Sequence, residues 1–512
     1  MDAVTRAGRA LTLVASGCVA SVALAAALAT ATPSPVRAPA TAHGGMAALP
    51  RLDARVRLTH GRPLAIPRSF LGISAEYWTI PDWAREVGTL ARITGQLATD
   101  GPLRLRVGGD SADRASWSPK RELPEWAFEL TPAWLRQADR IVRDAHLQLI
   151  LDLNIMSSTP RLAAVWARKS LRSLPRGSVR GFEIGNEPDI YNHSAWQHLT
   201  GGKGVPRLPS HITPTSYARS FNAYAAAVAR AAPGVPLLAP ALAEPQKHAD
   251  WIVKLLAAPH PRLAGITVHR YPYSACARRS APTYPSIPRV LSENASAGMG
   301  ATARALERIT DRARLPLWMT ETDSVTCGGL RGVSNTFATA LWAPDALFEL
   351  IRAGTEAAFV HVRPPLVNMA FSLTRSGLTA RPLLYGLLLF ARTLGPGAEL
   401  MPLRVTTAPS YRLKAWAVRV RGNLVHVLLL NKGARSGHVA LDGTGARGAT
   451  VERLRAPRIA ASDGVTLAGQ RLSRSGTWVG ARRTEPVTAS SRGIVLALPA
   501  YSAALVTLPA PR

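Results

Sequence analysis

The stretch Gly181-Phe-Glu-Ile-Gly-Asn-Glu-Pro-Asp189 decides the fold of this 512-residue chain. Its apolar residues predict a short strand, which delivers Asn186 and Glu187 at its end before Pro188 stops the extended run. In a parallel β/α barrel, polar functional side chains lie at the carboxyl ends of the strands. The stretch therefore predicts a barrel strand that ends in a carboxylate.

A second strand-like run, Pro316-Leu-Trp-Met-Thr-Glu-Thr-Asp323, ends in the same way at Glu321. Two opposed carboxyls, one ionised and one protonated, are what retaining glycoside hydrolysis requires, at a separation of roughly 5 Å. Glu187 and Glu321 are therefore the candidate catalytic pair. The alternative for each strand-end glutamate is a surface salt bridge.

The chain around these two stretches alternates strand-like runs with helix-like segments such as 216–232. Eight β/α units predict a closed parallel barrel, and short apolar runs suit strands that are buried on both faces. The eight predicted strands are 70–77, 103–107, 147–154, 181–184, 236–241, 265–269, 316–319 and 356–362.

Beyond about residue 393 the pattern changes to strands and Gly-rich turns, with runs at 415–421, 424–431, 493–498 and 503–508. This pattern predicts an all-β sandwich. We therefore expect an α/β fold: a (β/α)8 barrel at 68–392 with an accessory C-terminal β-sandwich at 393–512. The segment 54–67 is expected to add one or more strands to the sandwich.

The N-terminus has the pattern of an export signal. Arg6 and Arg9 precede an apolar stretch at 11–28, and small residues follow, which predicts a signal peptide at 1–31 and a secreted protein. An uncleaved membrane anchor is the alternative, because the stretch approaches the ~20 residues that span a bilayer. Residues 32–53, rich in Pro, Ala and Thr, are expected to form a flexible linker.

The formal net charge of +30 raises the question of a polyanionic partner. The arginines are scattered without a long basic run, so we expect neither a nucleic acid nor a membrane surface as partner, although acidic glycans remain compatible. No Cys or His cluster has zinc spacing, and no Gly-rich phosphate loop or dinucleotide motif occurs. We therefore expect no metal and no cofactor.

The mature chain would keep two cysteines, Cys276 and Cys327. They follow the sixth and seventh predicted strands at similar distances, and an exported protein meets an oxidising environment. A disulfide is therefore expected, with two buried free thiols as the alternative.

Other polar residues at strand ends could bind a sugar. Asn186 could hydrogen-bond a sugar hydroxyl, and Tyr271 could donate its phenolic proton to Glu321 and so help to keep it ionised. His269 lies two residues before Tyr271. A place in the hydrophobic core is the alternative for His269 and Tyr271.

The first two strands also end in carboxylates, in Gly72-Ile-Ser-Ala-Glu76 and in Leu105-Arg-Val-Gly-Gly-Asp-Ser-Ala-Asp113. We expect Glu76 and Asp113 to accept hydrogen bonds from sugar hydroxyls. The alternative is helix capping by Asp110 or Asp113.

These motifs carry a resemblance to a known family. Gly185-Asn-Glu-Pro188, His269-Arg-Tyr271 and Glu321-Thr322 resemble the barrel superfamily of retaining glycosidases. Within it, Phe70-Leu-Gly-Ile-Ser74 and Thr320-Glu-Thr-Asp-Ser-Val-Thr-Cys-Gly-Gly329 are similar to glycoside hydrolase family 79, the β-glucuronidase and heparanase family. The resemblance implies that Glu187 is the acid/base and Glu321 the nucleophile.

The resemblance also implies a substrate. In the family, backbone amides after the nucleophile hold the glucuronate carboxylate, and Gly328 and Gly329 match that stretch. Thr326 stands where the family has tyrosine, and Arg331 could compensate by pairing with a carboxylate. A secreted exo-β-glucuronidase is therefore expected. The alternatives are a retaining β-glycosidase for a neutral sugar and a non-catalytic polyanion-binding protein.

Overall fold

The computed structural model describes residues 51–117, 127–192 and 212–509. The predicted signal peptide, its alternative as a membrane anchor, and the linker up to residue 50 lie outside these ranges. Within the described ranges, no helix has both the length and the apolar character needed to cross a bilayer.

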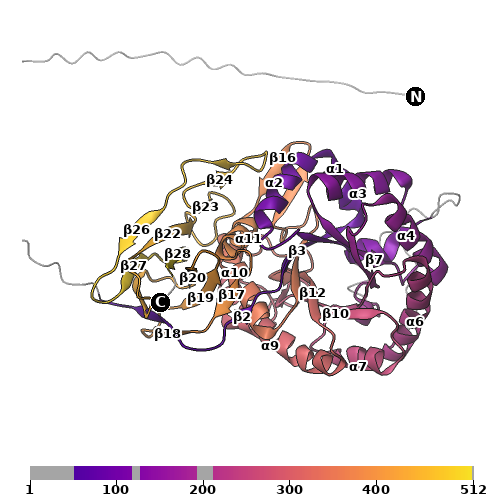
Figure 1. Ribbon diagram of the computed structural model, residues 1–512, viewed down its shortest axis with the longest axis horizontal. Coiled ribbons are helices and arrows are strands. Elements are labelled where there is room, and N and C mark those ends of the chain that lie inside the picture. The colour runs from indigo at the N-terminus through magenta and orange to yellow at the C-terminus, as the bar shows by residue number, and fades with distance from the viewer. Residues whose placement is uncertain (1–50, 118–126, 193–211, 510–512) are drawn as a thin grey trace, which may run out of the picture. The chain divides into compact units, whose positions relative to one another are not determined.

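Eight parallel strands close into a barrel (Figure 1), which confirms the predicted fold class. Each strand overlaps one of the eight predicted runs. In barrel order they are β3 (Leu71–Glu76), β4 (Arg104–Gly108), β7 (Gln148–Leu153), β8 (Val179–Ile184), β9 (Leu237–Leu242), β10 (Leu263–Arg270), β12 (Leu317–Thr322) and β14 (Ala357–Val362).

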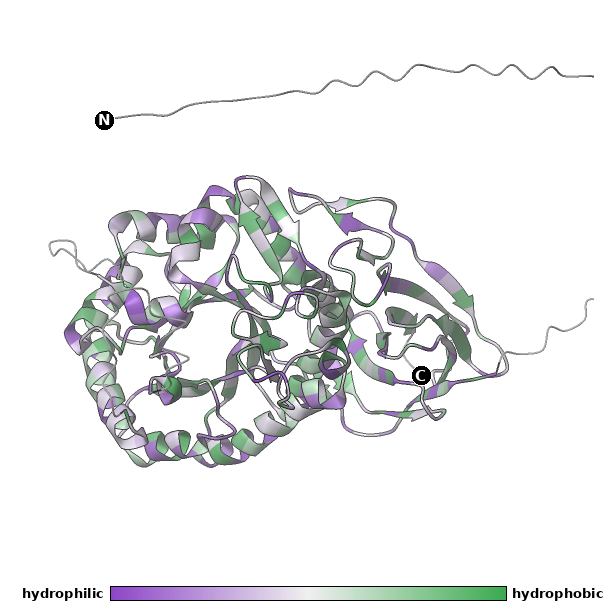
Figure 2. Cartoon of the chain, turned by 180° about the vertical axis from the view of Figure 1, so that it is seen from behind, coloured by the Kyte–Doolittle hydropathy of each residue, from purple (hydrophilic) through white to green (hydrophobic). Residues whose placement is uncertain are grey.

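Helices surround the barrel and cover the outer faces of its strands (Figures 1 and 2). Most have one buried stripe, as α3 does through Trp134 and Leu135, because the opposite side faces solvent. They include α1 (Ile80–Arg85), α2 (Val87–Leu97), α3 (Pro132–Asp144), α4 (Pro160–Ser173), α6 (Pro214–Ala231), α7 (Ala249–Ala257), α8 (Ile287–Val290), α9 (Glu293–Thr310), α10 (Phe337–Ala353) and α11 (Pro382–Thr393).

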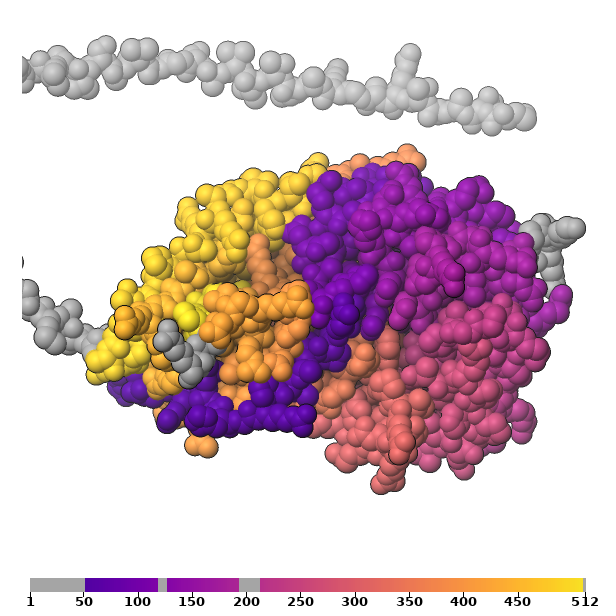
Figure 3. Space-filling view, in the orientation of Figure 1, coloured from indigo at the N-terminus to yellow at the C-terminus, as the bar shows by residue number. Residues whose placement is uncertain are grey.

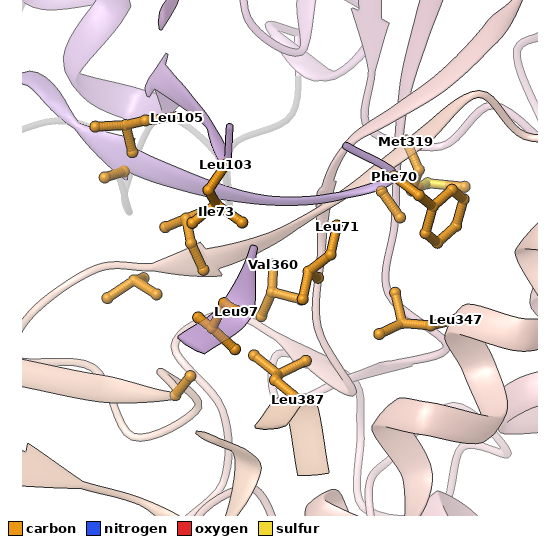
Figure 4. Packing of buried hydrophobic residues seen from close by; sticks show 14 of the residues in the cluster. Phe70, Leu71, Ile73, Leu97, Leu103, Leu105, Met319, Leu347, Val360 and Leu387 are labelled. Carbon is orange, nitrogen blue, oxygen red and sulfur yellow. The ribbon is translucent and has the colours of Figure 1, made fainter. Parts of the chain in front are cut away.

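The last two barrel helices, α10 and α11, are buried on nearly every side. They lie between the barrel and the C-terminal sheets (Figure 1). Gly386 lets them approach closely, since a Cβ atom there would lie 2.5 Å from the carbonyl oxygen of Ala340. Figure 4 shows the packing that joins Leu387 of α11 to barrel residues such as Leu71 and Val360.

The C-terminal part consists of two mainly antiparallel sheets, ordered β18-β1-β21-β27 and β2-β17-β19-β20-β28-β22-β23, with β26 paired to β22. Their strands are β1 (Ala54–Leu58), β2 (Leu64–Ala65), β17 (Glu399–Met401), β18 (Leu403–Thr407), β19 (Leu413–Val420), β20 (Leu424–Asn431), β21 (Gly437–Asp442), β22 (Gly448–Arg455), β23 (Thr466–Leu467), β26 (Glu485–Thr488), β27 (Ile494–Leu498) and β28 (Ser502–Pro509). They enclose a second apolar core.

The N-terminal segment of the described chain belongs to this sandwich. β1 pairs with β18 and β21, and β2 pairs with β17. In Figure 3 the indigo N-terminal residues accordingly lie against the orange and yellow C-terminal ones. Of the sandwich strands, β17, β18, β21, β22, β23 and β26 were not predicted, nor was the hairpin of β15 (Phe371–Thr374) and β16 (Gly377–Ala380) that precedes α11.

Candidate active site

Glu187 and Glu321 lie together at the carboxyl end of the barrel. Glu187 follows β8, and Glu321 is the penultimate residue of strand β12. One oxygen of each carboxyl group and a ring nitrogen of His269 all lie within 4.8 Å of one another. This spacing fits the roughly 5 Å of retaining glycosidases rather than the roughly 6.5–9.5 Å of inverting ones.

Glu187 is held in a tight, mostly buried setting. Its backbone is left-handed, with φ 51° and ψ 46°, and its N–H donates to the carbonyl of Ala241 at 3.0 Å. Its Oε1 lies 2.8 Å from Nδ1 of His269. Burial, followed by the negative charge of Glu321, raises the pKa of Glu187 well above its ordinary value. Burial also lowers the pKa of His269 to about 4, which keeps the imidazole neutral near pH 7.

Glu321 has the opposite electrostatic environment. Tyr271 Oη donates to its Oε1 at 2.6 Å, Arg106 Nη1 donates to its Oε2 at 3.0 Å, and His361 Nδ1 lies 2.8 Å from Oε1. Burial alone would raise the pKa of Glu321, but the positive charges of His361 and Arg106 hold it well below its ordinary value. The pKa values of the two glutamates are thus driven apart, which favours a protonated Glu187 beside an ionised Glu321.

His361 keeps its own positive charge. Burial opposes it, but the carboxylates of Glu321 and Glu76 outweigh burial and raise the pKa of His361 to about 10. His361 lies in β14, next to β12 in the barrel, so its ring meets Glu321 from the neighbouring strand.

Arg106 of β4 connects the groups under the site. It is fully buried, and its guanidinium donates to Glu183 Oε2 at 2.6 Å, to Asp152 Oδ2 at 3.0 Å and to Asn186 Oδ1 at 3.0 Å. Because it also bonds Glu321, one planar guanidinium orients both Glu321 and the residue that precedes Glu187.

A cavity of about 560 Å³ opens above the two glutamates. Such a volume is in the range of ligand pockets, roughly 300–1,000 Å³. Its walls come mainly from the segments that follow β4, β8, β9, β10, β12 and β14. The ionisable acidic and basic residues on its wall include Asp110, Glu187, Glu244, Lys247, Arg270, Glu321, His361 and Arg363.

The donor atoms of Glu187, His269 and Glu321 form a set that could in principle hold a metal ion. Arg106 and His361 already bring positive charge into contact with Glu321. A further cation beside them would be repelled in this buried setting. The arrangement suits acid–base and nucleophilic chemistry better than metal binding.

Three other predicted residues lie next to the glutamates, and they differ in how far they reach toward the cavity. Tyr271 lines the cavity and makes the predicted hydrogen bond to Glu321. Asn186 is buried and uses its oxygen to accept from Arg106. His269 is buried behind Glu187.

Glu76 and Asp113 lie beneath the cavity and not on its wall, which corrects the expectation that they reach sugar hydroxyls. Asp113 Oδ1 accepts from the hydroxyl of Tyr191 at 2.6 Å, and Glu76 Oε2 accepts from the backbone N–H of Ser111 at 2.8 Å. Both are fully buried by the loop that follows β4. Asp110, from the same loop, lines the cavity instead.

The loop after β12 divides the remaining predicted residues. Gly328 lines the cavity with φ 75°, a backbone conformation that favours glycine. The N–H of Gly329 is used within the loop, because it donates to Thr326 O at 3.2 Å. Arg331 is exposed and does not line the cavity, so its expected pairing with a substrate carboxylate has no geometric support.

The predicted disulfide between Cys276 and Cys327 is present, with the two Cα atoms 5.8 Å apart. Both cysteines line the cavity. The two-residue strands β11 (Tyr273–Ser274) and β13 (Val325–Thr326) pair just before them. The disulfide therefore fastens the loop that carries Gly328 to the loop that follows β10.

The site residues that escaped the sequence analysis as functional candidates include Arg106, Asp110, His361 and Arg363. A signal was present for two of them. Arg106 and His361 lie inside runs predicted to be strands buried on both faces, where a charged side chain needs a buried partner. Asp110 was considered only as a helix cap, and Arg363 lies just past its strand, where an exposed arginine is ordinary.

No family model matches this chain, and no curated protein sequence matches it. Solved structures of glycosidases have a similar fold. A 4-O-α-L-rhamnosyl-β-D-glucuronidase from Fusarium oxysporum is 19% identical over 89% of this chain and 100% of that one, with a TM-score of 0.70. A family GH51 arabinofuranosidase from Xanthomonas axonopodis pv. citri is 17% identical over 90% and 100% of the two chains, with a TM-score of 0.63.

A GH30 endoxylanase from Clostridium papyrosolvens C71 is also similar in fold, at 15% identity, with 90% of this chain and 100% of that chain covered and a TM-score of 0.52. At these identities the likeness shows the shared fold. These neighbours are named as a glucuronidase, an arabinofuranosidase and an endoxylanase, so they do not identify one sugar for this chain.

Proposed function

We propose that this protein is a secreted retaining β-glycosidase that acts as an exo-β-glucuronidase. The observation that carries the reaction type is the pair of glutamates, which approach within 4.8 Å and have pKa values driven in opposite directions. Carbohydrate is accordingly the expected partner.

The geometry supports a double displacement. Ionised Glu321 attacks the anomeric carbon and forms a glycosyl-enzyme ester, while protonated Glu187 gives its proton to the departing oxygen. Glu187, now ionised, takes a proton from a water molecule, which attacks the same carbon and releases Glu321. The sugar leaves with its original anomeric configuration.

The contacts around Glu321 support its role in both steps. Tyr271 and Arg106 fix the two carboxylate oxygens, so that the nucleophile is already oriented when a substrate arrives. Asn186 is buried directly before Glu187 and accepts from Arg106, so we assign it to positioning Glu187 rather than to a sugar hydroxyl.

Two observations favour a uronic acid as the sugar. Gly328 lines the cavity, and within the described residues nothing accepts a hydrogen bond from its N–H, which leaves a donor for a carboxylate. The same wall carries Lys247, Arg270 and Arg363. A neutral sugar is the second candidate, since Asp110 and Glu244 line the same cavity and Thr326 stands in place of the family tyrosine.

The test is a panel of aryl β-glycosides that differ in the sugar, with the configuration of the first product followed by NMR. We expect turnover of the β-glucuronide with retained configuration. Glu187→Gln and Glu321→Gln should both lose activity, whereas Glu129→Gln, an exposed glutamate outside the site, should not. Inverted configuration would refute the mechanism, and turnover of neutral glycosides alone would refute the uronate preference.

The panel also separates catalysis from polyanion binding, which the net charge of +30 suggests. Binding to a polyanion weakens steeply as salt increases, because counterions are released. Turnover of a small glycoside should change little between low and physiological salt. If the protein binds a polyanion in a salt-sensitive way and turns over no glycoside, the non-catalytic polyanion-binding function is favoured.

A further inference from the structure

Arg363 and Asp110 form an ion pair on the cavity wall, and the proposed mechanism assigns no role to it. Arg363 follows β14, and its guanidinium donates to Oδ2 of Asp110, in the loop that follows β4. Both residues line the cavity, and the side chains are 24% and 15% exposed, respectively. Each therefore keeps polar surface that a ligand can reach.

The pair is held in place from behind. Oε1 of buried Glu76 lies 3.5 Å from Nε of Arg363 and 3.5 Å from Nε2 of His361. The guanidinium carbon of Arg363 also lies 5.6 Å from the ring of Trp78. Since His361 contacts Glu321, the pair belongs to the same charged network as the nucleophile.

The position of the pair indicates which part of a substrate it meets. In the barrel order, β14 is the strand opposite β8, and β8 leads to Glu187. Glu187 must reach the departing oxygen, so the leaving group lies on its side of the cavity. The wall formed by Asp110 and Arg363 faces the part of the sugar that is away from the departing oxygen.

A partly exposed carboxylate beside a partly exposed guanidinium offers an acceptor and several donors within one small area. Two adjacent hydroxyls fit this pattern, because one can donate to Asp110 while its neighbour accepts from Arg363. A purely structural ion pair would need no cavity exposure.

We propose that Asp110 and Arg363 together bind two adjacent hydroxyl groups of the sugar beside Glu321, and that they determine which sugars the site accepts. This inference rests on the proposed function. It assigns to Asp110 the hydroxyl-binding role that Glu76 and Asp113, buried beneath the cavity, cannot fill.

The test combines substrate and enzyme changes. For the wild-type protein, we expect kcat/KM to fall roughly 10- to 100-fold when the 3- or 4-hydroxyl of the aryl glycoside is replaced by hydrogen, as for other hydrogen bonds to charged groups. For Asp110→Asn, kcat/KM on the full substrate should fall to a similar extent. The further loss on the deoxy substrate should shrink to a few-fold, because the two changes remove the same contact.

Control variants separate binding from a structural role. Arg331→Gln removes an exposed arginine outside the cavity and should leave the discrimination unchanged. Arg363→Lys, which keeps the charge, should retain more discrimination than Arg363→Gln. If Asp110→Asn lowers turnover of the full and deoxy substrates by the same factor, the pair is structural and the proposal is overturned.

Failure of the proposed function has a different signature. If the wild-type protein turns over no aryl β-glycoside, calorimetric binding of methyl β-glucuronide and its deoxy analogues still reads the pair directly. If wild type binds one deoxy analogue more weakly, and this difference is lost in Arg363→Gln or Asp110→Asn, the proposed binding by Asp110 and Arg363 is supported. Equal binding of all analogues to wild type overturns it.

Discussion

Two buried networks of charge occur in this molecule, and they are completed to different degrees. The first lies where α10 meets the sandwich. Asp345 of α10 accepts from Nζ of Lys432 and from Nε1 of Trp416, at 2.9 Å for the latter, while Nζ of Lys414 donates to Glu349 at 3.1 Å. Burial opposes ionisation of Asp345, yet Lys432 and Lys414 hold its pKa below the ordinary value.

The second network, around Glu321, is left incomplete. In the described part of the chain, Oδ1 of Asp152 and Nε2 of His269 are buried and make no hydrogen bond. Buried polar atoms without partners cost about 1–3 kcal/mol each. At the junction, paired charges therefore join α10 to the sandwich. Around Glu321, the incomplete pairing of buried polar groups lowers the stability of the fold.

Removal of charge at the site should abolish activity and leave the fold intact, which is the largest effect expected. Glu321→Gln should lower kcat by roughly 10⁴-fold or more, since a nucleophile has no substitute. Arg106 keeps Glu183 and Asp152 as partners in this variant. Turnover of the activated aryl β-glycoside and circular dichroism check the two halves of the prediction. Wild-type turnover would remove Glu321 from the mechanism.

Removal of a charge at the junction should lower stability and leave activity intact. Lys432→Met leaves Asp345 buried beside fewer positive charges, so we expect the free energy of unfolding to fall by about 3–5 kcal/mol. Activity per folded molecule should stay unchanged. Denaturant unfolding measures the loss, and Lys254→Met, an exposed lysine on α7, serves as the control. A combined Asp345→Asn and Lys432→Met variant should regain much of the stability.

A smaller change at the site should shift both rate and pH dependence. Tyr271→Phe removes one donor from Glu321 and should lower kcat/KM by roughly 10- to 100-fold, the range of a hydrogen bond to a charged group. Loss of that donor raises the pKa of Glu321, so the acidic limb of the rate profile should move to higher pH. Tyr501→Phe in the sandwich should change neither. An unmoved acidic limb would show that Arg106 and His361 suffice.

The smallest expected effect is the pH dependence of the wild-type protein. Glu321 must be ionised and has a lowered pKa, so it sets the acidic limb; Glu187 must be protonated and has a raised pKa, so it sets the alkaline limb. A bell-shaped kcat/KM profile on the acid side of neutrality follows. A rate that still rises above pH 8 would contradict the assigned roles.

The barrel could be predicted from sequence because its strands are locally distinct. Each is a short apolar run bounded by polar or Gly-containing segments, and all six residues of β3 are indeed buried. The sandwich was harder. β22 carries charged residues such as Glu452 and Arg453 on an alternating strand with only part of its surface buried, so it does not stand out as an apolar run.

The site divides along similar lines. Glu187, Glu321 and Tyr271 end strands and lie in recognisable local motifs. The roles of Asp113 and Glu76 depend on Tyr191 and Ser111, whose hydrogen bonds are set by tertiary packing. The proposed role of Arg363 depends on its contact with Asp110, which lies 253 residues earlier in the chain. A pair so distant in sequence leaves no local pattern from which it could be predicted.

The left-handed backbone at Glu187 has a consequence for engineering. For most residues with a Cβ, this conformation costs on the order of 1 kcal/mol or more. The cost is smaller for asparagine and for glycine. Glu187→Asn should therefore unfold at a higher temperature than the parent while it is inactive, which calorimetry can measure. Such a variant would be a more stable protein for trapping intact substrate. A higher unfolding temperature would mean that a glutamate stands at this position against the preference of the backbone.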